Sequence, residues 1–168
     1  MESKQKQFND TSMLSALGSR TTDYDLSEPK ADIFECFKNT TSRPYIINIE
    51  IPEWTGMCPK TGQPDFAHIS IAYMPRDLCI ESKSMKLYIV SYRNYGCFME
   101  STTNKFIDDM VAACQPYWIK VQGIYNPRGG IDLNVNAEYY SSDIGDHSEY
   151  IPQHVFGKDK MQVPAFYF

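Results

Sequence analysis

Cys58 and Asp65 lie seven positions apart in a turn-rich run, and together they could act as a nucleophile and a proton donor. A thiolate attacks electrophilic carbon readily, and a nearby carboxylic acid can protonate the atom that becomes basic during the attack. Pro59, Gly62 and Pro64 prevent a continuous helix or central strand here, so we expect a shaped loop that displays both groups. The alternative is that Cys58 is a small buried hydrophobe and Asp65 a turn former.

The composition is that of an ordinary globular chain. With 168 residues, 42% of them hydrophobic and 14% aromatic, the sequence can build one sizeable core. We expect a polar N-terminal arm over residues 1–30 and a single catalytic domain over residues 31–168. The formal net charge of -5 and the absence of a Lys/Arg block argue against direct binding of nucleic acid or a membrane surface. A small polar ligand fits better.

Cysteine and histidine usage indicates a reduced, metal-free protein. The cysteines have no CxxC spacing and follow no secretory leader, which predicts a cytoplasmic protein without disulfides or structural zinc. The histidines, His68, His147 and His154, form no metal-binding pattern, so we expect no catalytic metal. No apolar run is long enough to span a membrane.

Two hairpins are predicted from alternating apolar residues. Strands over 45–51, ended by Pro52, and over 66–73 flank the Cys58 loop. A second pair of strands over 117–125 and 131–139 is joined by a glycine-rich turn at 126–130.

The remaining segments give mixed signals. Apolar residues at helical spacing predict one substantial helix over 98–114. Residues 86–92 are strand-like, and the preceding residues 81–86 could be a loop or a helical turn. We also expect a short turn at 13–17 and an apolar C-terminus, residues 164–168, that docks on the body or on a neighbouring subunit.

Several segments match one known family in order and spacing. They are the Cys58 loop, the run Glu-Ser-Lys-Ser-Met-Lys-Leu-Tyr at 81–88, and residues 91–96, 98–100 and 127–130. The chain therefore resembles the short, single-module form of the 7-cyano-7-deazaguanine reductase family. The resemblance implies an α+β tunnelling fold, in which an antiparallel sheet carries helices on one face in the order hairpin, two helices, hairpin. It also implies a homo-oligomer of two stacked rings, a decamer, with sites at subunit boundaries.

The resemblance assigns the chemistry to the Cys58 loop. Cys58 would add to the nitrile carbon to give a covalent thioimide, Asp65 would protonate the nitrogen, and NADPH would reduce the adduct to a primary amine in queuosine biosynthesis, a tRNA modification pathway. From the residues alone, Lys60 or backbone N–H groups of the turn could lower the pKa of the thiol. Burial beside Phe66 and Trp54 would raise the pKa of Asp65.

By resemblance, Glu100 anchors the purine-like ring by accepting two N–H donors. The alternative is an ordinary glutamate at a helix start. The full expected substrate-binding set is Phe98, Met99, Glu100, Ile80, Glu81 and Ser82.

The chain departs from the family pattern at Met99, where members usually carry histidine. A thioether can neither shuttle a proton nor donate a hydrogen bond. We hypothesise that His68 compensates, the alternative being a hydrogen-bonded strand histidine. The Tyr95 hydroxyl could also contribute.

The run at 81–88 is associated with NADPH in the family. Its lysines and hydroxyls, together with an arginine beside two glycines, suit the phosphates of the cofactor, and there is no GxGxxG motif. The expected cofactor-binding residues are Ser82, Lys83, Ser84, Lys86, Arg128 and Gly129. The alternative is that the lysines form a solvated basic surface and that Tyr88 packs in the core.

Two other functions remain open from the sequence. One is an amidine-forming transferase that captures the same nitrile without NADPH, although retention of the run at 81–88 argues against it. The other is a non-catalytic purine- or pterin-binding module that uses the scaffold and Glu100, although the thiol and acid placed together argue against it.

Overall fold

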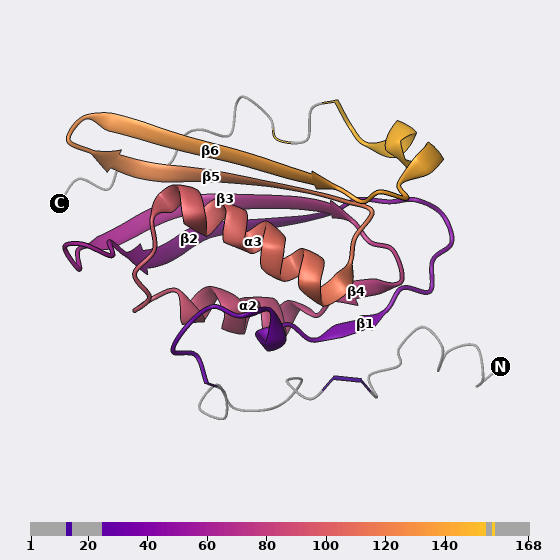
Figure 1. The fold of residues 1–168 in the computed structure, drawn as a ribbon, viewed down its shortest axis with the longest axis horizontal. Coiled ribbons are helices and arrows are strands. Elements are labelled where there is room, and N and C mark those ends of the chain that lie inside the picture. Colours follow the sequence, from indigo (N-terminus) through magenta and orange to yellow (C-terminus); the bar gives the residue numbers. More distant parts are fainter. Residues whose placement is uncertain (1–12, 15–24, 154–155, 157–168) are drawn as a thin grey trace.

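The computed structural model describes residues 13–14, 25–153 and 156. Its elements follow in the order η2 (Ala31–Ile33), β1 (Cys36–Lys38), β2 (Ile47–Met57), β3 (Pro64–Met74), β4 (Leu78–Ile80), α2 (Ser82–Ser91), α3 (Met99–Cys114), β5 (Trp118–Arg128), β6 (Ile131–Tyr140) and η3 (Gly145–Tyr150). The two long hairpins form a four-stranded antiparallel sheet in the order β2-β3-β5-β6, and β1 pairs with β4 in a small second sheet. Both α-helices lie on one face of the large sheet (Figure 1). The predicted α+β class, with an antiparallel sheet and helices on one face, is confirmed.

The main core lies between the large sheet and the helices. Along β3, Ile69, Ile71 and Tyr73 are buried and point to the helix side, because alternate residues of a strand face the same way. Phe106 and Met110 of α3 meet them with side chains that are fully buried. The helix predicted over 98–114 is therefore confirmed, and its apolar stripe is what covers the sheet.

The strand-like reading of residues 86–92 is wrong, because these residues belong to helix α2. Glu81 caps this helix, its side chain accepting a hydrogen bond from the backbone N–H of Ser84 at 3.0 Å. Met85 and Tyr88, three residues apart, are both buried and give the helix an inner face. Alternation over a few residues could not reveal the cap, which sets the conformation of the segment.

The strand predicted to end at Pro52 instead continues to Met57. The pairs Ile51↔Ile69 and Trp54↔Ala67 leave two residues of β2 opposite one residue of β3, which is a β-bulge. Pro52 is tolerated because β2 is an edge strand and the proline sits in the bulge. The extra residue also reverses the alternation, so that Trp54 faces the helices.

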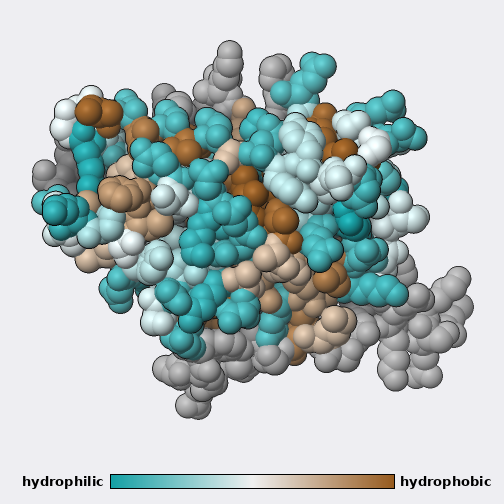
Figure 2. All heavy atoms as spheres, in the orientation of Figure 1, coloured by the Kyte–Doolittle hydropathy of each residue, from teal (hydrophilic) through white to brown (hydrophobic). Residues whose placement is uncertain are grey.

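The helix-free face of the sheet has a small cluster of its own. Ala72, Met74 and Trp118 are buried there, and Ile144 and Ile151 from the segment after β6 pack against them. Figure 2 shows that polar side chains dominate the face seen in Figure 1 and interrupt its hydrophobic areas. None of the helices in the described part of the chain is both long and apolar enough to cross a membrane. The predicted apolar C-terminus and most of the predicted turn at 13–17 lie outside the described residues.

Candidate active site

The Cys58 loop is a tight connection between β2 and β3. The Cys58 N–H donates to the Gln63 carbonyl at 2.8 Å, and the Gly62 N–H donates to the Cys58 carbonyl at 2.9 Å. Gly62 has φ +68°, a left-handed conformation that glycine adopts without strain. Cys58 is half-buried. The loop thus presents the thiol from a fixed turn, as the sequence predicts.

Hydrogen bonds within this loop favour the thiolate. The Thr61 hydroxyl has the largest effect, followed by the backbone N–H groups of Thr61 and Lys60, and together with Arg128 they lower the pKa of Cys58 to about 7. Of the two sources considered from the sequence, the backbone N–H groups contribute. Sequence reasoning missed Thr61, although a hydroxyl residue three positions after a cysteine in a turn is a signal that could have been used.

Asp65 is buried, with 4% of its surface exposed, and pairs with Gly56 across β2 and β3. Burial raises the pKa of its carboxyl group, and the positive charge of Arg128 opposes that rise. The predicted direction of the shift is confirmed, but the predicted contact with Phe66 is wrong. Phe66 is 46% exposed and, as the next residue of the strand, points to the other face of the sheet.

The guanidinium of Arg128 contacts the carboxylate of Asp65. Its Nη2 forms an ion pair with Asp65 Oδ1 and also donates a hydrogen bond to the Pro64 carbonyl at 3.2 Å. Arg128 ends β5, and the turn that follows has φ +57° at Gly129 and +76° at Gly130. Two successive positive φ values make this a two-residue hairpin turn that suits glycine. The tips of the two hairpins therefore meet at the acid.

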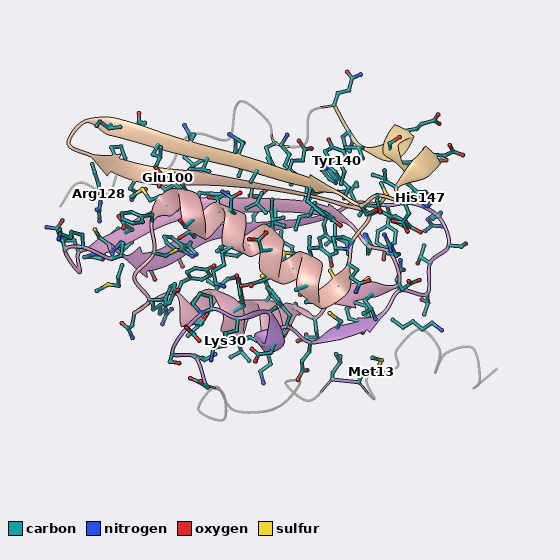
Figure 3. All side chains as sticks on the ribbon, viewed as in Figure 1. Met13, Lys30, Glu100, Arg128, Tyr140 and His147 are labelled. Carbon is teal, nitrogen blue, oxygen red and sulfur yellow. The ribbon has the colours of Figure 1, made fainter. Side chains whose placement is uncertain are left out.

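Glu100 lies in the first turn of α3, close to the same end of the molecule, as Figure 3 shows for Glu100 and Arg128. The end of β2 is tied to the segment before α3, because the Met57 N–H donates to Tyr95 and the Cys97 N–H donates to Met57, both at 3.1 Å. Glu100 is exposed. It lines an open depression of about 530 Å³ together with Tyr95, Cys97, Ser101, Asn104, Lys105 and Asp108.

The residues before Glu100 have different surroundings. Phe98 is 63% exposed, which leaves its ring available to a ligand. The Met99 side chain packs against the main core, and its carbonyl accepts a hydrogen bond from the Tyr125 hydroxyl at 2.7 Å. Met99 therefore contributes packing and a backbone acceptor to the base of α3.

The geometry does not support the hypothesis that His68 compensates for Met99 in handling protons at the site. Its Nε2 is 2.7 Å from Glu50 Oε2, and Ser70 donates to the same oxygen at 2.6 Å. His68 is three positions from Asp65 in one strand, so the two side chains face opposite sides of the sheet. The structure supports the alternative of a hydrogen-bonded strand histidine.

The expected cofactor residues of α2 divide into exposed and buried groups. Ser82 and Lys86 are exposed and Lys83 is half-buried. Ser84 is fully buried and donates to the carbonyl groups of Glu81 and Glu35. In Figure 1, α2 begins on the side of β4 and runs toward the end that carries the Cys58 loop.

Three further positions around the start of α2 and within it are buried. Glu81 and Ile80 are buried, the first as the cap of α2 and the second at the end of β4. Tyr88 is fully buried and donates to Asp109 Oδ2 at 2.6 Å, so it packs in the core. Among the described residues, no group of three or more His, Cys, Asp or Glu side chains is arranged to hold a metal ion.

Known proteins resemble the chain in sequence and in fold. A family profile described as QueF-like protein matches residues 64–143. NADPH-dependent 7-cyano-7-deazaguanine reductase from Nitratidesulfovibrio vulgaris is 47% identical over 131 residues, which cover 77% of this chain and 79% of the relative. The enzyme of that name from Nitrosomonas europaea is 52% identical over 106 residues, which cover 62% of this chain and 76% of the relative.

A solved structure shares the fold. The crystal structure of the archaeosine synthase QueF-Like in the apo form superposes with a TM-score of 0.55 at 22% identity. The match covers 60% of this chain and 98% of that one. This likeness concerns the fold and confirms the tunnelling-fold prediction.

Proposed function

The chain belongs to the family of NADPH-dependent 7-cyano-7-deazaguanine reductases, and we propose that it reduces the nitrile of 7-cyano-7-deazaguanine to the primary amine of 7-aminomethyl-7-deazaguanine. The observation that carries this function is that an activated thiol at Cys58 and a buried acid at Asp65 flank one short loop, and that Arg128 acts on both. The product would enter queuosine biosynthesis and so serve tRNA modification.

The proposed first step is covalent. The Cys58 thiolate adds to the nitrile carbon, so that a C–S bond forms while one C–N π bond breaks, and Asp65 donates a proton to the nitrogen. The product of this step is a thioimide. A pKa of about 7 provides the thiolate near neutral pH, while burial of Asp65 favours the protonated acid that the nitrogen requires.

NADPH supplies the hydrides that reduce the thioimide to the amine when it is bound. The exposed Ser82 hydroxyl and the ammonium groups of Lys83 and Lys86 fit its phosphates, since all three residues lie in the first turns of α2. The Ser84 hydroxyl fits less well, because it is buried and already donates to carbonyl groups. Arg128 and Gly129 stay predicted members of this set.

The Glu100 carboxylate would accept hydrogen bonds from two N–H groups of the deazaguanine ring. Its exposed carboxylate on the wall of an open depression supports this role, and the exposed ring of Phe98 beside it could stack on the substrate. An analogue without the two donors would leave the carboxylate unpaired and should bind poorly.

We propose that the working form is a homo-oligomer of two stacked rings, a decamer. In the described sheet, β2 and β6 are edge strands, and pairing of such edges between copies would remove them. A neighbouring copy could also bring its α2 to the Cys58 loop. We place the enzyme in the cytoplasm, where thiols such as Cys58 are kept reduced. Sedimentation analysis of the purified protein tests the assembly.

A spectroscopic and kinetic assay tests the function. Mixing the protein with 7-cyano-7-deazaguanine should give an adduct that absorbs beyond the free nitrile, and adding NADPH should lead to its oxidation. Cys58→Ala should abolish both signals. Adduct formation without NADPH oxidation would instead indicate an amidine-forming transferase, and the absence of both signals would indicate a binding module.

A further inference from the structure

Arg128 has a different position from the other residues expected to bind phosphate. Its guanidinium contacts Asp65 and Pro64, whereas Lys83 and Lys86 lie on α2. We propose that Arg128 is a positioning residue, which holds the acid and the thiol loop in their working arrangement before any ligand binds. This inference rests on the proposed function, because it assigns Asp65 and Cys58 the roles given above.

The strand geometry directs Arg128 toward Asp65. Tyr125 pairs with Leu133 and Arg128 with Ile131, so two residues of β5 lie opposite one residue of β6. This β-bulge reverses the alternation of side chains. Arg128 therefore faces the side that Tyr125 and Asp65 face, and not the helix-free side. The two-glycine turn directly after Arg128 fixes the end of the strand.

The electrostatics are consistent with a contact that acts on both reacting groups. In the described part of the chain, Arg128 is the charged group that acts on Asp65, and it opposes the rise in pKa caused by burial. On Cys58, Arg128 adds a smaller effect to the larger ones of the Thr61 hydroxyl and the Thr61 and Lys60 backbone donors. A guanidinium keeps its charge at every relevant pH, so this influence is permanent.

The test uses the full chain without nitrile or NADPH. The rate of Cys58 alkylation by iodoacetamide is measured against pH for the wild-type protein, Arg128→Met and Arg128→Lys. We expect the midpoint of Arg128→Met to move upward from about 7 and its alkylation at pH 7 to fall by about 2- to 5-fold. Arg128→Lys keeps the charge and should recover part of the loss.

Arg43→Met is the matched control, since it removes the same charge from an exposed residue outside the site. It should leave the alkylation profile unchanged. The Asp65 carboxyl is followed in parallel by its ¹³C NMR titration, and its midpoint should rise in Arg128→Met. If Arg128→Met does not fold, the smaller shifts of Arg128→Lys decide the question.

Unchanged midpoints for both Cys58 and Asp65 in a folded Arg128 variant would overturn the proposal. If the KM for NADPH then rose, Arg128 would keep only its predicted role as a phosphate ligand. Because alkylation and NMR titration need neither substrate, a failure of this proposal is distinguishable from a failure of the reductase assignment.

Discussion

The indole ring of Trp54 lies directly over Gly56, so that a Cβ atom at position 56 would be 2.5 Å from Cη2 of the ring. Gly56 pairs with Asp65, and the ring is therefore packed against the strand position opposite the acid. Gly56→Ala should destabilise the fold by about 1–3 kcal/mol, since the buried ring must move. Urea denaturation measures this loss.

A double-mutant cycle checks that the ring is the cause. Trp54→Phe gives a smaller ring and loses no hydrogen bond, because Trp54 Nε1 has no partner among the described residues. The Gly56→Ala penalty should be clearly smaller in the Trp54→Phe background. Equal penalties in both backgrounds would show that the glycine is needed for another reason.

Thr61 should control the reactivity of Cys58. Thr61→Val removes the hydroxyl and keeps the shape and the backbone N–H, so the pKa of Cys58 should rise from about 7 toward 9.0. Iodoacetamide alkylation at pH 7 should then slow by about 3- to 10-fold. Thr61→Ser is the matched control and should keep the wild-type profile. A wild-type profile for the valine variant would exclude the hydroxyl as a cause.

Asp65 should reduce the stability of the protein at neutral pH. Because burial raises its folded-state pKa above the ordinary 3.8, the protonated form is favoured in the folded protein, and stability falls as the pH rises through that folded pKa. Asp65→Asn should therefore be more stable than the wild type at pH 7, because a neutral amide avoids the cost of burying the carboxylate charge. The difference should vanish below pH 3.8, as thermal unfolding across pH can show. A constant difference would contradict this explanation.

The turn after Arg128 should tolerate only residues that accept a positive φ. Gly129 has φ +57° and no atom within reach of an added Cβ, so strain and not crowding decides the outcome. Gly129→Asn should be nearly neutral, whereas Gly129→Val should cost about 1–2 kcal/mol. Thermal unfolding compares the two variants. Equal stabilities would show that the hairpin can relax.

Much of the fold could be predicted because the long strands and α3 have clear periodicity. Helix α2 could not, since its inner face mixes serines with apolar residues, which weakens the helical pattern, and its start depends on the Glu81 cap. Proline usually ends a strand, so Pro52 predicted the end of β2. The strand continues because Pro52 lies in a bulge, which only the strand pairing reveals.

Some residues of the candidate site could also be predicted from the sequence, and others could not. Cys58 and Asp65 could be found because their types and the turn between them are local in sequence. The contact of Arg128 with Asp65 joins residues of two hairpins, 63 positions apart (128 − 65), and depends on strand register, which local sequence patterns do not specify. Thr61 was missed because an ordinary turn threonine becomes chemically relevant only once its hydroxyl is seen to act on the thiol.

Each long hairpin contains one extra residue just before the part that serves the site, next to Trp54 in β2 and next to Arg128 in β5. The number of residues in these two places therefore matters independently of which residues they are, because it sets the face of the sheet on which the following side chains lie. Removing a single residue such as Asn126 would leave every functional side chain present while turning Arg128 away from the acid. Surveys of natural variation should accordingly find substitutions at these bulges far more often than single-residue deletions.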